Sequence, residues 1–310
     1  MEGREPAGPL LSGVVVHWHN EELLAGLVAA WPRDPRFELL VVDNGSSAPL
    51  PEGVRILRPG RNLGFAGGAN LGIAEGRGEI LLILNPDAVP EPGALESLLE
   101  GFARYPNAAG LAPRLLGLAG ESQAAWQLRK IPSAWDLLLH ALPLPGSSED
   151  GPEPAAGDPV EQPAAAALAL RRQALEKVGG FDPGFHPAWF EDVDLALRLQ
   201  ESGLVLRYWP AARFRHHLGS TVPRLGYGPF LFLYYRNLTR YLAKHHGRGW
   251  AVAARLALVP GIAARLLALP LRRPRRAASR REAFRGLLAV LAGALSGWTR
   301  PRRLAEVAAS

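Results

Sequence analysis

Short apolar runs alternate with helical patterns over the first hundred residues of the chain. Buried strands are predicted at residues 13–17, 37–43, 54–57 and 80–84, where apolar runs end in polar or turn-forming residues. Helices are predicted between and after them, at 21–31, 67–74 and 95–102. Strands that alternate with helices form a sheet covered on both faces, so the pattern predicts an α/β fold with a mostly parallel sheet flanked by helices.

The second half of the chain is less regular. Residues 143–163 are rich in Pro, Gly, Ser and acids, which is typical of a flexible surface loop. Strands are predicted at 164–170 and 205–209, and helices at 172–178 and through 195–202. From residue 229 the pattern is helical and increasingly basic.

Several kinds of site and a signal peptide can be argued against from the residues and motifs that the sequence lacks. The 310 residues contain no cysteine, so disulfides, zinc–thiolate sites and thiol nucleophiles are excluded. No HExxH, Walker or nucleophile-elbow motif is present, which argues against a zinc protease, a P-loop NTPase or a serine hydrolase. Residues 1–9 hold no apolar run of the kind a signal peptide needs, so we expect a cytoplasmic protein.

Charge divides the chain into an acidic body and a basic tail. Residues 240–310 carry 15 Arg or Lys against 2 acids, a net charge of +13, whereas residues 1–239 carry 20 against 27, a net charge of −7; together they give the chain's +6. The tail also contains apolar blocks, which favour an anionic membrane surface over nucleic acid as its partner. A solvated basic face on packed helices is the simpler alternative. No uninterrupted apolar run reaches about 18 residues, so no membrane-spanning helix is expected.

Three acids stand within four residues at Glu191, Asp192 and Asp194, directly after Trp189 and Phe190. Acids at the start of a helix are stabilised by the helix dipole, so this is one interpretation of the cluster. Carboxylates crowded beside aromatic rings are also typical of a site that needs a base. The cluster alone leaves both interpretations open.

Two further acids, Asp43 and Asp87, follow predicted strands at the edge of the sheet where ligands bind in α/β folds. Asp43 is suited either to cap a turn or to bind a nucleobase or ribose. Asp87 is suited to a turn or to Mg²⁺ or Mn²⁺, which prefer oxygen ligands. The Gly-rich segment 61–70 either packs a helix on the sheet or faces an anion, and His216 is either structural or a ligand of a metal or phosphate.

In chain order, these segments resemble glycosyltransferase family 2, the inverting GT-A enzymes with a Rossmann-like sheet, and most of all its rhamnosyltransferase-like branch. The resemblance covers about residues 12–246. The matching motifs are Val41–Ser47, Asn62–Asn70, Leu84–Asp87, Gly179–Asp182, Glu191–Leu195, His216 with Gly219, and Arg236–Asn237.

The resemblance implies a role for each matching position. Asp192 is the expected catalytic base, with Glu191 beside it. Asp87 and His216 are the expected ligands of Mg²⁺ or Mn²⁺. The implied donor-binding residues are His17, Asp43, Asn62, Gly64, Asn70, Asn85 and Asp87, and the implied acceptor-side residues are Trp189, Phe190, Trp126 and Arg129.

The chain departs from the family pattern near the first strand and the acceptor site. The first strand of the family usually ends in an aromatic residue followed by Asn, and here that stretch reads His17–Asn20. Gln162 and Ala165 stand where an aromatic residue and a glycine are common. These differences affect substrate contacts and leave Asp43, Asp87 and Asp192 in place.

The resemblance therefore predicts an inverting, metal-dependent glycosyltransferase. The expected donor is a dTDP- or UDP-sugar, first of all dTDP-rhamnose. The expected acceptor is a glycan or polyprenyl-linked saccharide of the cell envelope, at the inner face of the plasma membrane. The expected domains are a catalytic domain at 1–246 and a basic amphipathic helical extension at 247–310. A catalytically silent nucleotide- or glycan-binding protein and a nucleic-acid-binding module remain as alternatives.

Overall fold

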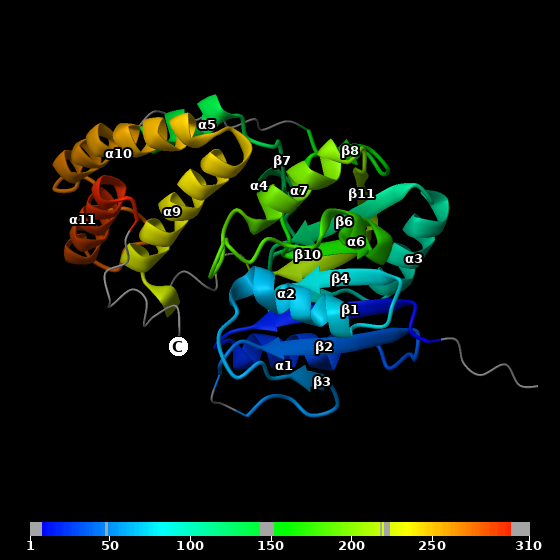
Figure 1. Cartoon of the computed structure of the whole chain (residues 1–310). Helices are drawn as coiled ribbons and strands as arrows, with labels where there is room; N and C mark the ends of the chain where they lie inside the picture. Colours follow the sequence, from blue (N-terminus) through cyan, green and yellow to red (C-terminus); the bar gives the residue numbers. More distant parts are fainter. Residues whose placement is uncertain (1–7, 47–48, 143–151, 218, 220–223, 299–310) are drawn as a thin grey trace, which may run out of the picture. The chain divides into compact units, whose positions relative to one another are not determined.

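The computed structural model describes residues 8–46, 49–142, 152–217, 219 and 224–298 (Figure 1). The chain forms two compact units. The first comprises residues 1–131, 150–183 and 191–218, and the second comprises 132–149, 184–190 and 219–310. The chain therefore leaves the first unit and returns to it twice before it continues into the C-terminal helices.

The first unit is built on a nine-stranded mixed sheet, with strand order β3-β2-β1-β4-β10-β6-β11-β5 and β8 paired to β11. Six strands run in one direction, because β1 is parallel to β2 and β4, β2 is parallel to β3, and β6, antiparallel to β10, is parallel to β11. The strands are β1 (Leu11–His17), β2 (Phe37–Asp43), β3 (Arg55–Leu57), β4 (Ile80–Leu84), β5 (Ala88–Pro90), β6 (Ala108–Leu116), β8 (Pro159–Val160), β10 (Ala167–Arg171) and β11 (Val205–His216). The predicted α/β class and mostly parallel sheet are confirmed.

Strand β10 runs against its two neighbours in the middle of the sheet. Ala167 pairs with Leu84 and Arg171 with Ile80, so the chain enters β10 at the edge where β4 ends. A parallel strand would require a crossover back to the opposite edge. The preceding segment provides none: β9 (Gln162–Pro163) pairs with β7 (Leu128–Arg129) in a separate two-stranded sheet.

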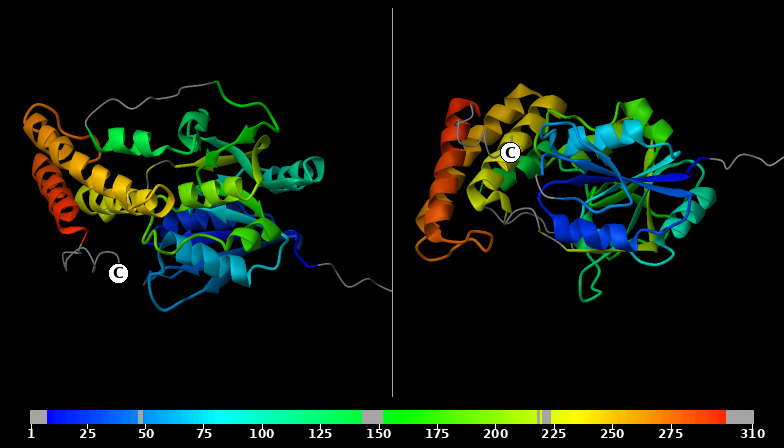
Figure 2. Two further views of the ribbon diagram at one scale, coloured as in Figure 1. Left: turned by 45° about the horizontal axis from the view of Figure 1, so that its top comes forward. Right: turned by 90° about the horizontal axis from the view of Figure 1, so that it is seen from below.

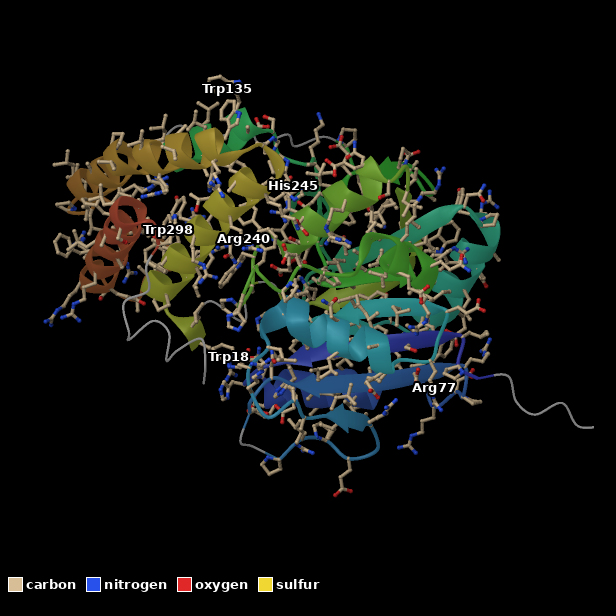
Figure 3. The ribbon with its side chains drawn as sticks, in the orientation of Figure 1. Trp18, Arg77, Trp135, Arg240, His245 and Trp298 are labelled. Carbon is tan, nitrogen blue, oxygen red and sulfur yellow. The ribbon has the colours of Figure 1, made fainter. Side chains whose placement is uncertain are left out.

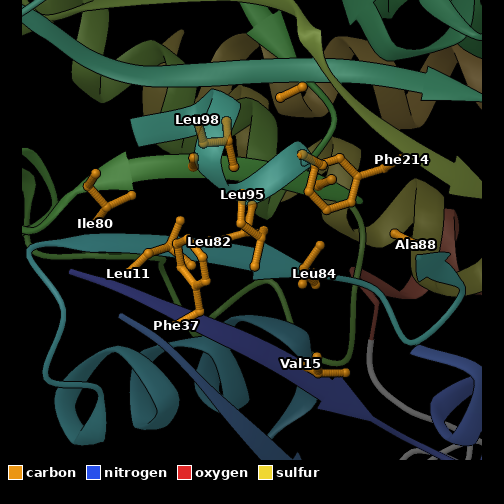
Figure 4. Packing of buried hydrophobic residues seen from close by; sticks show 14 of the residues in the cluster. Leu11, Val15, Phe37, Ile80, Leu82, Leu84, Ala88, Leu95, Leu98 and Phe214 are labelled. Carbon is orange, nitrogen blue, oxygen red and sulfur yellow. The ribbon is translucent and has the colours of Figure 1, made fainter. Parts of the chain in front are cut away.

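Helices cover both faces of the main sheet, as the alternating pattern predicted. Side chains of α1 (Glu21–Ala30) and α3 (Ala94–Arg104) pack with Leu11, Val15 and Leu82 in one apolar core (Figure 4). On the other face, α2 (Gly64–Glu75), α6 (Arg172–Val178) and α7 (Glu191–Glu201) pack with Val14 and Ile83. Figure 2 shows α1 and α2 on opposite sides of the sheet. A short helix, α4 (Ala124–Gln127), follows β6.

Residues 143–163 were predicted to form a flexible loop. Of these, 143–151 lie outside the described residues and 152–163 are described. Its described part is anchored to the sheet. Glu153 accepts hydrogen bonds from Arg114, Ser122 and Tyr208, and residues 159–160 form β8 against β11.

The described part of the second unit is helical. It contains α5 (Ala134–Ala141), α9 (Tyr227–His245), α10 (Arg248–Ala268) and α11 (Arg280–Ser296) (Figure 1). Ser133 and Asp136 form a capping box at the start of α5, and Ser279 caps α11. Helices α9 and α11 approach closely where Gly228 faces Gly286, since a Cβ on Gly286 would lie 2.8 Å from Gly228 Cα. The predicted domain boundary at residue 246 stays a prediction.

By length and composition, α10 is apolar enough to cross a membrane, contrary to the expectation from the sequence. The sequence suggested that Arg255, Pro260 and Arg265 would interrupt this segment. The helix instead continues through Pro260. Arg255 donates to the carbonyl oxygen of Ala294, and Arg265 to that of Ala141, so both guanidinium groups serve packing within the unit.

Candidate active site

His17 and Asp43 end the adjacent strands β1 and β2 and are paired in register. Asp43 Oδ1 accepts hydrogen bonds from the Ser46 backbone N–H at 2.9 Å and the Ser46 hydroxyl at 2.6 Å, so Asp43 does cap the turn. His17 Nε2 accepts from the Asn20 backbone N–H, so a neutral ring carries its proton on Nδ1, 3.9 Å from Asp43 Oδ1. The Arg58 guanidinium lies 3.6 Å from Asp43 Oδ2. The turn is thus built around a buried carboxylate whose second oxygen faces a cation.

The Gly-rich segment beside this turn is held by asparagine side chains. Asn44 donates to the Gly64 carbonyl oxygen and accepts from the Leu63 backbone N–H, and Asn62 accepts from the Gly64 N–H. Gly64 has φ 71°, a conformation that favours glycine. Asn70, a predicted donor-binding residue, donates to the Phe181 carbonyl oxygen and accepts from the Phe181 N–H. These side-chain bonds shape the backbone of the segment.

The glycines of α2 allow it to lie close to the sheet. A Cβ on Gly68 would lie 2.9 Å from the Val16 side chain, and one on Gly72 would overlap Val14. The structure therefore supports the packing interpretation for these two glycines, and anion binding by the segment stays a prediction.

Asp87 and His216 lie together at the same edge of the first unit. Asp87 follows β4 in a turn, and His216 is the last residue of β11. His216 Nε2 is 3.5 Å from Asp87 Oδ1, and both side chains are only 2% exposed. Burial lowers the pKa of His216; the Asp87 charge opposes that shift and His217 adds to it. The neutral imidazole is therefore favoured.

The His216 ring is held by Gln123, which caps the N-terminus of α4, and by Trp126 within α4. His216 Nδ1 is 2.8 Å from Gln123 Oε1, and Gln123 Nε2 donates to the His216 carbonyl oxygen at 2.9 Å. The Trp126 ring stacks on the imidazole, with a centroid separation of 5.2 Å and an interplanar angle of 28°. Trp126, predicted on the acceptor side, therefore contacts a predicted metal ligand.

The donor atoms of Asp87 and His216 fit a divalent cation. A carboxylate oxygen and an imidazole nitrogen face each other, both as acceptors when the ring is neutral with its proton on Nδ1. Among the described residues, no group of three or more His, Asp or Glu side chains is placed to hold a metal. Two protein ligands nevertheless suffice for Mg²⁺ or Mn²⁺ at a phosphate site, because substrate oxygens and water complete the shell. Asn85 is half-buried in the turn before Asp87.

Asp192 lies on the first turn of α7, in the same unit. Its Oδ2 accepts from Gln162 Nε2 at 3.3 Å and is 3.9 Å from the Arg129 guanidinium, and its Oδ1 faces the Val193 backbone N–H. The side chain is partly exposed. The Gln162 amide and the Arg129 guanidinium therefore orient a carboxylate that remains partly open to solvent, as a proton acceptor requires.

The two acids beside Asp192 have different surroundings. Asp194 is buried and pairs with Arg198 one turn along α7. Glu191 is 7% exposed, and burial, followed by the charges of Asp192 and Asp194, raises its pKa well above the usual value. The raised pKa favours the protonated form of Glu191. Of the three acids, Asp192 has the most accessible side chain.

Trp189 and Phe190 belong to the second unit, within the segment 184–190. Both have positive φ, 75° and 73°, which is costly for non-glycine residues and is sustained here by side-chain contacts. Trp189 packs on Phe230, and Phe190 on Tyr234. Their acceptor-side role stays a prediction.

Two helix residues from the Arg236–Asn237 motif anchor this segment. Buried Asn237 donates to the carbonyl oxygens of Ala188 and Trp189, at 2.8 and 3.1 Å, and Arg236 donates to that of His186. The two polar side chains of the motif therefore have a structural role in an otherwise aromatic helix: they donate hydrogen bonds to backbone carbonyl oxygens of the segment 184–190.

Sequence reasoning missed the two buried glutamines that flank α4, Gln123 and Gln127. The only local signal is two amides four residues apart in an otherwise apolar stretch. Buried amides require hydrogen-bond partners, but the partner of Gln123 is 93 residues away in the chain.

Comparison with known proteins identifies the family. The model for glycosyl transferase family 2 matches residues 14–145. An N-acetylglucosaminyl-diphospho-decaprenol L-rhamnosyltransferase from Mycobacterium tuberculosis (strain ATCC 25618 / H37Rv) is 29% identical over 289 residues, which cover 83% of this chain and 92% of that protein. A pre-mycofactocin glycosyltransferase from the same organism is 31% identical over 222 residues, covering 69% of this chain and 44% of that protein.

Solved structures support the fold. The mannosyltransferase PcManGT from Pyrobaculum calidifontis, in complex with GDP-Man and Mn²⁺, has a TM-score of 0.52 at 17% identity, covering 94% of this chain and 88% of that one. GalNAc-T7 with UDP, GalNAc and Mn²⁺ has a TM-score of 0.53 at 14% identity, covering 77% and 48%. The family and fold predicted from the sequence are thereby confirmed: the chain belongs to glycosyltransferase family 2, and is a GT-A enzyme that transfers a sugar from a nucleotide sugar.

Proposed function

We propose that this enzyme is an inverting, metal-dependent glycosyltransferase that moves rhamnose from dTDP-rhamnose to a hydroxyl of a glycan or polyprenyl-linked saccharide in cell-envelope polysaccharide synthesis. The similarity to a rhamnosyltransferase over 92% of that relative's length supports the sugar and the acceptor class. The observation that carries the chemistry is one unit that holds both an accessible carboxylate, Asp192, and a pair of facing acceptor atoms, on Asp87 and His216.

Asp192 acts as the general base. Its carboxylate takes the proton of the acceptor hydroxyl as the oxygen attacks the anomeric carbon and the bond to the diphosphate breaks. A single displacement inverts the configuration at that carbon. Gln162 and Arg129 hold the carboxylate in place before the reaction.

Asp87 and His216 would hold the cation on the leaving-group side. When bound, Mg²⁺ or Mn²⁺ offsets the negative charge that develops on the departing diphosphate. Asp43 binds the nucleotide through Oδ2, while Oδ1 remains bonded to Ser46. His17 supports that carboxylate from the adjacent strand.

The second unit carries an exposed apolar surface that fits a membrane. Of the twelve large hydrophobic side chains most exposed among the described residues, nine belong to this unit: Trp135, Leu139, Val252, Leu256, Leu267, Leu271, Phe284, Leu288 and Leu295. Trp135 projects from α5 (Figure 3). So many exposed apolar groups in one unit exceed the scattered ones of an ordinary soluble surface.

The exposed residues of α10 and α11 form stripes. On α10 they are spaced three or four residues apart: Val252, Leu256, Pro260, Ala263 and Leu267. On α11, Leu288 follows Phe284 by four residues and Leu295 follows Leu288 by seven, which is about two turns. Residues spaced in this way share one helix face. Each helix therefore presents an apolar face, as helices that lie in the plane of a membrane do.

Arginines surround the connection between these helices. Arg272, Arg273, Arg275 and Arg276 are all exposed, and Leu271 among them is 89% exposed. A basic residue near an anionic bilayer contributes about 1 kcal/mol to binding. We therefore propose that this face docks on the anionic inner face of the plasma membrane, where a polyprenyl-linked acceptor resides.

Flotation with vesicles containing phosphatidylglycerol tests the docking. Leu256→Glu and Leu267→Glu together should reduce bound protein at least about tenfold, since each places a charge in the apolar face. Leu118→Glu is the matched control, because Leu118 in the first unit is 65% exposed, as is Leu256. Equal flotation of the double variant and wild type would contradict the proposal, as would salt-dependent DNA binding without vesicle binding.

A panel of nucleotide sugars, assayed with Mg²⁺ or Mn²⁺ and a polyprenyl-linked N-acetylglucosamine acceptor, tests the function. The proposal predicts metal-dependent rhamnosyl transfer from dTDP-rhamnose and a product whose anomeric configuration is inverted by NMR. Binding of nucleotide sugars without any turnover would instead indicate a silent binding protein. Retained configuration would contradict the single displacement.

A further inference from the structure

Gln123 makes two hydrogen bonds to a single residue, His216, one to its backbone and one to its ring. A backbone carbonyl oxygen only accepts hydrogen bonds, so the amide atom facing the His216 carbonyl must be the NH₂ group. The other amide atom is therefore the oxygen, and it faces His216 Nδ1 at 2.8 Å. Because an amide oxygen only accepts, Nδ1 must carry a proton.

The second ring nitrogen then has a defined role. In a neutral imidazole with its proton on Nδ1, Nε2 presents a lone pair. This is the nitrogen that faces Asp87 Oδ1 at 3.5 Å. Gln123 thus selects the tautomer that directs a metal-binding lone pair toward Asp87.

The frame that holds Gln123 is rigid. Its backbone N–H bonds to the Leu115 carbonyl oxygen, and its carbonyl oxygen accepts from Gln127 N–H. Gln127 in turn accepts from Leu115 N–H and donates to the Pro113 carbonyl oxygen. Strand β6 carries both of these residues and pairs with β11, which ends at His216.

Trp126 restricts the ring from a different direction, because it stacks on the imidazole. A ring held by a hydrogen bond in its plane and an aromatic neighbour across its face has little freedom to rotate. Second ligand shells of this kind set the orientation and tautomer of metal-binding histidines.

We propose that Gln123 is a positioning residue, which fixes His216 in the Nδ1–H tautomer so that Nε2 and Asp87 bind the divalent cation together. The inference rests on the metal-dependent function proposed above. Gln123 contacts neither the cation nor the substrate; it acts through His216.

Nitrogen NMR of histidine rings in the metal-free enzyme measures the tautomer directly. The chain has 8 histidines, and the His216→Gln spectrum identifies the signals of His216. We expect a protonated Nδ1 and an unprotonated Nε2 in wild type, and a populated Nε2–H tautomer in Gln123→Leu. Gln123→Glu loses the donor to the His216 carbonyl oxygen but keeps an oxygen acceptor for Nδ1, so it should retain the wild-type tautomer.

Gln127→Leu is the matched control. Gln127 is the last residue of the short helix that Gln123 caps. It is also buried and also makes two side-chain hydrogen bonds, but both go to backbone groups outside His216. Gln127→Leu removes these side-chain bonds but keeps the backbone bonds that hold Gln123, so it should lower stability without changing the His216 signals. If Gln127→Leu and Gln123→Leu altered the tautomer equally, the effect would come from general loosening and the inference would be overturned.

Calorimetry of Mn²⁺ binding in the presence of dTDP provides the second readout. Gln123→Leu should weaken Mn²⁺ affinity about 10- to 100-fold, while Gln123→Glu and Gln127→Leu remain within about threefold of wild type. Unchanged affinity and tautomer in Gln123→Leu would overturn the inference. If His216→Gln bound Mn²⁺ as wild type does, the proposed metal site would fail instead, and the tautomer result would still decide the role of Gln123 toward His216.

Discussion

Arg198 Nε donates to Asp194 Oδ2 at 2.8 Å, four residues away on α7. Asp194 is fully buried, so this pair neutralises a charge that would otherwise be costly inside the first unit. The acids of the cluster therefore divide into a structural one, Asp194, and an accessible one, Asp192.

Asp194→Asn should therefore lower stability. The substitution leaves Arg198 without its charged partner, and a hydrogen bond between charged groups contributes about 1.5–3 kcal/mol. Urea denaturation followed by circular dichroism should show a loss of that size. Asp192→Asn is the matched control on the same helix turn and should unfold within about 0.5 kcal/mol of wild type, since its side chain is partly exposed. Equal stability losses in the two variants would contradict this division.

Glu191→Gln should stabilise the enzyme increasingly as pH rises. The folded-state pKa of Glu191 is raised above its usual value, 4.5, chiefly by burial. The contribution of Glu191 to the free energy of unfolding is therefore fully present below its pKa in the unfolded chain. It is lost as pH rises through its pKa in the folded enzyme. A glutamine does not titrate. Urea denaturation at about pH 5 and about pH 8 should show a larger advantage for Glu191→Gln at the higher value; a constant difference, or one that shrinks with pH, would refute the assignment.

Gly286→Ala tests the crossing of α9 and α11. The added Cβ would lie 2.8 Å from Gly228 Cα, so the two backbones must separate. We expect a loss of about 1–3 kcal/mol, as for overpacked cores. Gly249→Ala in α10 is the control, because nothing lies within 4 Å of its Cβ position, and it should stabilise by about 0.5–1 kcal/mol. Thermal unfolding measures both, and a neutral Gly286→Ala would show that the helices do not meet there.

Much of the first unit could be predicted because its strands are continuous apolar runs. Strands β1, β2 and β4 end at or just before His17, Asp43 and Asp87, so the polar edge of the sheet was visible in the sequence. Strand β6 was missed because Gly110 and Pro113 weaken its strand pattern. Gly110 is required there, since a Cβ would lie 2.6 Å from the Ala169 carbonyl oxygen on β10.

The candidate site was less predictable, because its features depend on contacts between distant segments. The motifs identified Asp87, Asp192 and His216. They did not show the burial and the contacts that give neighbouring side chains different roles. The burial of Glu191, the Asp194–Arg198 pair and the Gln123–His216 bonds require the folded chain. The apolar face of α10 was also obscured, since Arg255 and Arg265 seemed to interrupt it but face neighbouring helices.

The most direct test of the account is the activity of Asp192→Asn with a nucleotide sugar and acceptor, measured beside its Mn²⁺-dependent binding of dTDP. The account predicts a loss of turnover of about 10²- to 10⁴-fold, as for a removed general base, with nucleotide affinity within about threefold of wild type. Turnover near the wild-type rate would contradict it, because Asp192 could not then be the base.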